Sequence, residues 1–193
     1  MNQLIQKTKE LKKEAQLILN DLNLESFFLK YGKVKLVGSI TFGLMTWEDI
    51  DIDLVTKDKP TDELFWKVAQ YLFAKESTKL LMLADNRTGL KEANRPKSMY
   101  LGLHYQPDNG VLWKLDIRLI QKNDIRETPN WMHSLNTIDK QKKLAILQIK
   151  NRLKNDPRYH KEISSVDVYN AVINHNVISY DSFMNYVTNK TIS

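Results

Sequence analysis

The segment from Asp49 to Val55 constrains the fold more than any other part of the sequence. Aspartates occupy every second position, and aliphatic residues occupy the positions between them. Because successive side chains of a β-strand point to opposite faces of a sheet, this alternation predicts a strand with one aliphatic and one acidic face. Three like charges on one face destabilise a strand unless cations compensate for them. The alternative interpretation is an exposed edge strand whose charges prevent aggregation.

A predicted turn precedes the acidic strand. Residues 33–37 form a short run rich in apolar residues, which predicts a strand that ends at Gly38 and Ser39. The glycine permits a tight turn close to a phosphate, and the serine hydroxyl and the backbone amides can donate to phosphate oxygens. The turn is therefore a candidate phosphate-binding element.

A third candidate carboxylate lies on a later strand. Residues 111–120 again alternate, and the apolar side chains at the odd positions from Trp113 onward are expected to face the core. Lys114, Asp116 and Arg118 then share the face on which the first strand shows its aspartates. For Asp116 alone, the alternative is a surface ion pair with one of these two cations.

Together these residues resemble the signature of the DNA polymerase beta-like nucleotidyltransferase superfamily. That signature consists of an apolar strand, Gly-Ser, a spacer, two carboxylates separated by one apolar residue, and a third carboxylate on a later strand. The resemblance covers roughly residues 30–120. It implies an α/β (α+β) fold with a short mixed sheet backed by helices, and a C-terminal helical subdomain.

The resemblance also implies a mechanism and a set of roles. Asp49, Asp51 and Asp116 would bind two Mg²⁺ ions, with Mn²⁺ as the alternative ion, and Asp116 would draw the proton from the acceptor hydroxyl. The residues that would bind the phosphates of a nucleoside triphosphate are Gly38, Ser39, Lys114 and Arg118.

Asp53 leaves the choice of the metal-binding pair open. It shares the acidic face, so the pair is either Asp49 with Asp51 or Asp51 with Asp53. The first pair is preferred because it lies at the end of the strand nearest the turn.

Helical and strand patterns predict the elements around this site. An amphipathic helix is expected over residues 3–22. A second helix is expected to begin at residues 60–63, with the Thr61 hydroxyl as its cap and Trp66 in the core. Residues 98–105 and 111–120 flank turn residues and predict a hairpin. The polar segment 85–97 is expected to be a solvated loop, and its alternative is a phosphate or RNA contact through Arg87, Lys91, Arg95 and Lys97.

The C-terminal third is expected to be helical. Thr137 is predicted to cap a helix that Pro157 ends, and the Ser164 to Asp167 and Ser179 to Ser182 spacings predict two further helix starts. The predicted domains are residues 1–127, which carry the catalytic site, and residues 128–193, a helical subdomain.

Composition and size restrict the location, the partners and the substrates that we expect for this protein. The 193 residues include no cysteine and no apolar run long enough to cross a bilayer, which favours a cytoplasmic location. The net charge of +6 favours anionic partners. Small stand-alone members of the superfamily resemble enzymes that modify lincosamides or aminoglycosides, so we expect AMP transfer to a small-molecule hydroxyl. The alternatives are transfer to a tRNA end or a protein hydroxyl, a non-catalytic nucleotide-binding or toxin–antitoxin partner module, and a purely structural interaction protein.

Overall fold

The chain forms two compact units that each contain more than one segment of the sequence. In the computed structural model, residues 3–87, 96–125, 127–159 and 161–192 are described. The larger unit contains residues 11–41 and 47–126, and the other contains residues 1–10, 42–46 and 127–193. The predicted division into residues 1–127 and 128–193 stays a prediction.

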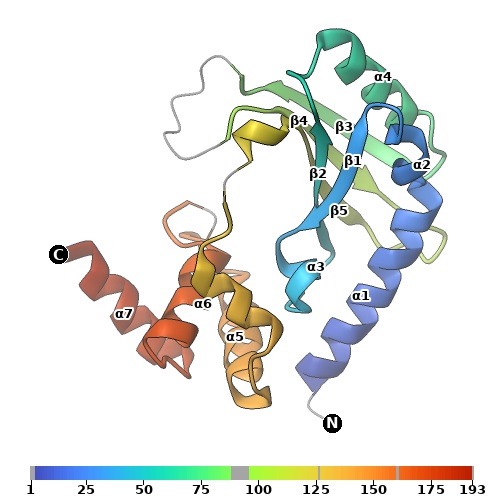
Figure 1. Ribbon diagram of the computed structural model, residues 1–193. Coiled ribbons are helices and arrows are strands. Elements are labelled where there is room, and N and C mark those ends of the chain that lie inside the picture. Colours follow the sequence, from blue (N-terminus) through green and yellow to red (C-terminus); the bar gives the residue numbers. More distant parts are fainter. Residues whose placement is uncertain (1–2, 88–95, 126, 160, 193) are drawn as a thin grey trace. The chain divides into compact units, whose positions relative to one another are not determined.

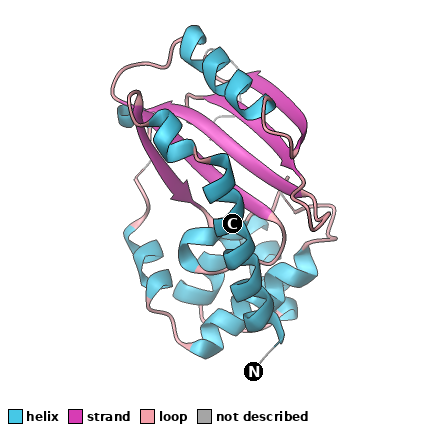
Figure 2. Ribbon diagram, turned by 90° about the vertical axis from the view of Figure 1, so that its right-hand side faces the viewer, coloured by secondary structure: helices cyan, strands magenta, loops and turns pink. Residues whose placement is uncertain are grey.

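A five-stranded mixed sheet forms the centre of the larger unit, with the strand order β1-β2-β5-β4-β3 (Figures 1 and 2). Strand β2 is parallel to β5, and the other three neighbouring pairs are antiparallel. The predicted acidic strand and hairpin are confirmed as β2 and as the pair β4 and β5. The bounds are Gly32–Val37 for β1, Asp49–Thr56 for β2, Thr78–Asp85 for β3, Met99–Tyr105 for β4 and Trp113–Gln121 for β5.

Alternation along β2 and its neighbour β5 separates a buried face from a polar face. Ile50, Ile52 and Leu54 of β2 are fully buried. The same holds for the four odd-numbered residues from Trp113 to Leu119 of β5. Because residues paired across strands share a face, the even-numbered residues of β5 lie on the aspartate face of β2, as predicted.

Helices α2 (Leu24–Phe28) and α4 (Asp62–Phe73) contribute to this core, as does α1 (Gln3–Leu22) from residue 11 onward. The buried residues of α4 are Phe65, Val68, Ala69 and Leu72, which form one stripe of an amphipathic helix. Thr61 caps α4 by accepting a hydrogen bond from the Leu64 amide, as its sequence predicted. The predicted α/β class, with a mixed sheet backed by helices, is confirmed.

Two features of the larger unit differ from the sequence predictions. Strand β3 was not predicted, because residues 80–84 form a continuous apolar run without alternation, which does not distinguish a strand from a buried helix. Trp66 was expected in the core, but 56% of it is exposed because it lies off the buried stripe of α4. Residues 88–95 of the predicted loop lie outside the described residues.

The other unit is helical and encloses a loop that precedes β2. Its main helices are α5 (Lys140–Leu153), α6 (Ser165–Asn174) and α7 (Tyr180–Ile192). Lys150 is buried, and its ammonium donates to the Leu44 carbonyl at 2.7 Å. The Thr8 hydroxyl donates to the next carbonyl, that of Met45, at 2.6 Å.

The ends of helices α5 and α6 differ in part from those predicted from the sequence. The cap of α5 is Asp139, which accepts from the Lys142 amide, and not Thr137, whose hydroxyl donates to the Ser134 carbonyl. Helix α5 ends at Leu153, before Pro157. The helix start predicted from Ser164 and Asp167 is confirmed as that of α6, where the two residues form a capping box.

Candidate active site

Three carboxylates converge where β2 and β5 run side by side. The parallel register pairs Asp51 with Asp116, and Asp49 with Lys114. One oxygen from each of Asp49, Asp51 and Asp116 lies within 4.8 Å of the others. Within the described part of the chain this is the one group of three or more acidic or histidine side chains with such a spacing. The structure thus brings together the three residues that the sequence singled out.

The electrostatics of these carboxylates favour a bound cation. Burial, and after it the nearby charges of Asp49 and Asp116, raise the pKa of Asp51 from 3.8 to about 7. Arg118 and Lys114 oppose this shift but do not cancel it. Three carboxylate oxygens at this spacing are the donor set of a hard divalent cation such as Mg²⁺, which would relieve the repulsion. The residues therefore fit the metal that the resemblance implies.

The turn at Gly38 lies directly against Asp51. Gly38 has a φ of 69°, and a Cβ atom placed on it would lie 2.2 Å from Asp51 Oδ2. The Thr41 hydroxyl donates to the Gly38 carbonyl at 2.7 Å and holds the turn closed. Ser39 follows as the first residue of α3 (Ser39–Phe42) and is partly exposed. The turn therefore places backbone amides and a hydroxyl beside the carboxylates.

The two predicted phosphate-binding cations are each hydrogen-bonded to an aspartate. Lys114 Nζ lies 2.7 Å from Asp116 Oδ2, and 48% of its side chain is exposed. Burial acts to lower the pKa of Lys114, but the hydrogen bond to Asp116 and the surrounding carboxylates outweigh it and raise the pKa. Arg118 Nε lies 2.7 Å from Asp53 Oδ1, with 35% of its side chain exposed. Both cations lie on the aspartate face of the sheet.

Asp53 is placed differently from the other two aspartates of β2. Only 3% of its side chain is exposed, and its carboxylate is bonded to Arg118. It does not belong to the group of converging carboxylates. Asp49 and Asp51 therefore converge with Asp116, whereas Asp53 is paired with Arg118.

Three residues of the site were not predicted from the sequence. Tyr100 of β4 donates a hydrogen bond to Asp116 Oδ1, and Gly102 lies opposite Asp116 in the β4 and β5 register. The third is Thr41, which donates to the Gly38 carbonyl. The predicted hairpin register could have identified the first two, because alternate residues of β4 share the face of Asp116.

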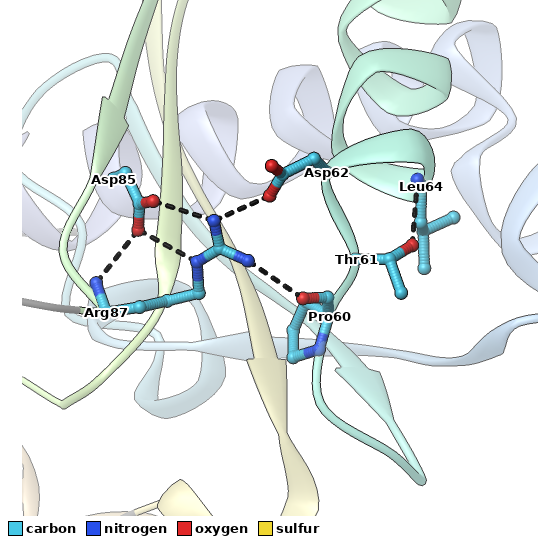
Figure 3. A network of polar contacts seen from close by, with 6 residues as sticks. All are labelled: Pro60, Thr61, Asp62, Leu64, Asp85 and Arg87. Atoms are coloured by element: carbon cyan, nitrogen blue, oxygen red, sulfur yellow. Dashed lines mark hydrogen bonds and ion pairs between the residues drawn. The ribbon is translucent and has the colours of Figure 1, made fainter.

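Arg87, a candidate for phosphate or RNA contact, has a structural role outside this site. Its guanidinium forms two hydrogen bonds with Asp85, at 2.9 and 2.7 Å, and one with Asp62 at 2.6 Å (Figure 3). It also donates to the Pro60 carbonyl at 3.1 Å. Arg87 therefore connects the end of β3 to the start of α4.

Comparison with known proteins supports the fold but not a close relationship. No family model matches the chain, and no curated protein matches its sequence. A mutant of the Cid1 poly(U) polymerase bound to MgATP superposes with a TM-score of 0.62 at 19% identity, over 84% of this chain and 49% of that one. A cytoplasmic RNA terminal U-transferase gives 0.58 at 16% identity, over 89% of this chain and 51% of that one.

A third solved structure, Cid1 in complex with its short product ApU, gives a TM-score of 0.60 at 17% identity, over 88% of this chain and 53% of that one. The chain thus spans about half the length of the solved structures that it matches. At these identities the likeness shows a shared fold, and this fold agrees with the one that the predicted resemblance implies. None of the helices in the described ranges is long and apolar enough to span a membrane.

Proposed function

We propose that this protein is a metal-dependent nucleotidyltransferase that moves a nucleoside monophosphate from a nucleoside triphosphate to a hydroxyl group. The observation that carries the proposal is the convergence of Asp49, Asp51 and Asp116 within 4.8 Å, next to a glycine turn that touches one of them. The likeness in fold to nucleotide-binding polymerases and transferases supports it. The absence of cysteine favours the cytoplasm as its location.

The proposed reaction is an in-line displacement at the α-phosphorus of the triphosphate. The acceptor oxygen forms a bond to the α-phosphorus, and the bond from this phosphorus to the bridging oxygen of the β-phosphate breaks. Pyrophosphate leaves, and the hydroxyl proton passes to Asp116. Divalent ions held by Asp49, Asp51 and Asp116 would neutralise negative charge on the phosphates and lower the pKa of the attacking hydroxyl.

The remaining side chains of the site would bind and orient the triphosphate. The Gly38 turn and Ser39 would donate backbone and hydroxyl hydrogen bonds to the terminal phosphates. Lys114 and Arg118 would add positive charge at one face of the sheet, where partial burial strengthens their interaction with phosphate. Asp53 would keep Arg118 in place, because the two side chains are already paired.

The proposed acceptor hydroxyl belongs to one of two classes of molecule, a small molecule or RNA. AMP transfer to a small molecule, such as an antibiotic, follows from the resemblance of small stand-alone superfamily members to antibiotic-modifying enzymes. Transfer to the 3′ hydroxyl of RNA is favoured by the structural neighbours, two of which are a poly(U) polymerase and an RNA terminal U-transferase. The net charge of +6 agrees with the RNA acceptor.

The test is a transfer assay with each of the four labelled nucleoside triphosphates, Mg²⁺ or Mn²⁺, and separate panels of antibiotics, RNA oligonucleotides and proteins. We expect labelled product and pyrophosphate in equal amounts. Asp49→Asn and Asp116→Asn should each reduce turnover by about 10³-fold, as expected for the loss of a metal ligand at the reacting phosphate. Asp108→Asn is the matched control, since Asp108 is exposed in the turn between β4 and β5.

The outcomes separate the proposal from its alternatives. Product in one panel identifies the acceptor class. Binding of a triphosphate with Mg²⁺, seen as a rise in melting temperature, without transfer in any panel would indicate a non-catalytic nucleotide-binding module. Wild-type turnover in both aspartate variants would refute the mechanism.

A further inference from the structure

Asp116 is held by two donors, one on each oxygen of its carboxylate. Lys114 Nζ donates to Oδ2 at 2.7 Å, and the Tyr100 hydroxyl donates to Oδ1. Lys114 belongs to the same strand as Asp116, whereas Tyr100 belongs to β4 and reaches Asp116 from the neighbouring strand. The orientation of this carboxylate is therefore fixed from two directions.

Gly102 creates the space that the Tyr100 contact needs. It lies opposite Asp116 in the register of β4 and β5. A Cβ atom at position 102 would lie 2.7 Å from the Tyr100 hydroxyl oxygen and 3.0 Å from Met82 Cε. A side chain at this position would therefore displace the hydroxyl that bonds to Asp116. The contact of Tyr100 with Asp116 therefore depends on the glycine at position 102.

We infer that Tyr100 is a positioning residue for the third metal-binding carboxylate, with Gly102 as its structural partner; this inference rests on the proposed function. A carboxylate on a strand can rotate about two side-chain bonds, and only some orientations direct an oxygen toward an ion shared with Asp49 and Asp51. Hydrogen bonds to a metal ligand restrict that rotation, and their loss costs 10- to 100-fold in metal affinity or activity in characterised sites. Tyr100 supplies such a bond without adding charge.

The first test compares Tyr100→Phe with Tyr105→Phe. Tyr105 lies on the same strand but on the core face, is 1% exposed, and has no hydrogen-bond partner for its hydroxyl within the described residues. The two variants make the same chemical change. We expect Mn²⁺ to bind Tyr100→Phe 10- to 100-fold more weakly than wild type, while Tyr105→Phe binds Mn²⁺ normally.

The second test is a double-mutant cycle with Gly102→Ala. If alanine acts by displacing the Tyr100 hydroxyl, Gly102→Ala should weaken Mn²⁺ binding to a similar extent as Tyr100→Phe. The double variant should then be no weaker than either single variant, because the same hydrogen bond is lost in each. Melting temperatures of all variants, measured without metal, show whether each one is folded.

Mn²⁺ titration separates this inference from the proposed function, because it requires no acceptor. Weakened Mn²⁺ binding by Tyr100→Phe supports the positioning role even if no transfer reaction is found. Wild-type affinity in Tyr100→Phe overturns the positioning role even if the wild-type protein is an active transferase. A wild-type protein that binds no Mn²⁺ overturns both.

Discussion

Replacing Asp51 by asparagine is expected to stabilise the metal-free protein while removing a metal ligand. The pKa of Asp51 is raised from 3.8 to about 7, mainly by burial and then by Asp49 and Asp116. One pKa unit corresponds to about 1.4 kcal/mol. The ionised carboxylate therefore destabilises the folded state by an upper limit of roughly 4 kcal/mol at a pH above 7.

The sign of the pH dependence follows from proton binding. Between pH 4 and 7 the folded protein binds more protons at Asp51 than the unfolded chain, so this residue reduces stability as the pH rises through that range. Asparagine carries no charge, so the stability of the variant does not fall at this position as the pH rises. The gain from Asp51→Asn should be largest near pH 8 and should vanish near pH 4.

Thermal unfolding of the two proteins at pH 8 and pH 4, in the presence of a chelator, measures this effect. If half of the upper limit is realised, about 2 kcal/mol, the melting temperature at pH 8 should rise by roughly 4 to 8 °C in a chain of this size. Mg²⁺ should then raise the melting temperature of the wild type but not of the variant. An Asp51→Asn protein that melts at or below the wild-type temperature at pH 8 would refute the electrostatic reasoning.

Two further substitutions test the surroundings of the site. Gly38→Ala places a Cβ atom 2.2 Å from Asp51 Oδ2 and requires alanine to adopt an unfavourable φ of 69°. We therefore expect that Mg²⁺ no longer raises the melting temperature of this variant. A wild-type response to Mg²⁺ would show that the turn does not position Asp51. Arg87→Ala should reduce the free energy of unfolding by about 1 kcal/mol, since its partners Asp85 and Asp62 are partly exposed. Mn²⁺ affinity should stay at the wild-type value in that variant, and its loss would place Arg87 in the site.

The strands of the site could be predicted from the sequence because their residues alternate. In β2 and β5, period-two alternation identified both the buried residues and the residues of the polar face, including Asp116. The helix over residues 3–22 and the cap at Thr61 were likewise local features. Local patterns sufficed because each element buries one face, and the face is encoded in its own residues.

The contacts between distant elements could not be predicted in this way. The ion pair of Asp53 with Arg118 needs β2 beside β5, and no local pattern pairs these two strands, which lie far apart in the sequence. The contact of Tyr100 with Asp116 differs, because β4 and β5 are the two strands of the predicted hairpin. Trp66 was predicted wrongly for a different reason. Its large apolar side chain suggested burial, but it does not belong to the buried stripe of α4 and is exposed.

The parallel pairing of β2 with β5 explains why a site forms at this position. A parallel neighbour requires a crossover connection, and the chain between the two strands builds α4, β3 and β4 before it returns as β5. The return places Asp116 opposite Asp51. A slip of one residue in β5 would turn Asp116 toward the core and expose its apolar neighbours. The apolar residues that stabilise the sheet therefore also fix the register that brings the carboxylates together.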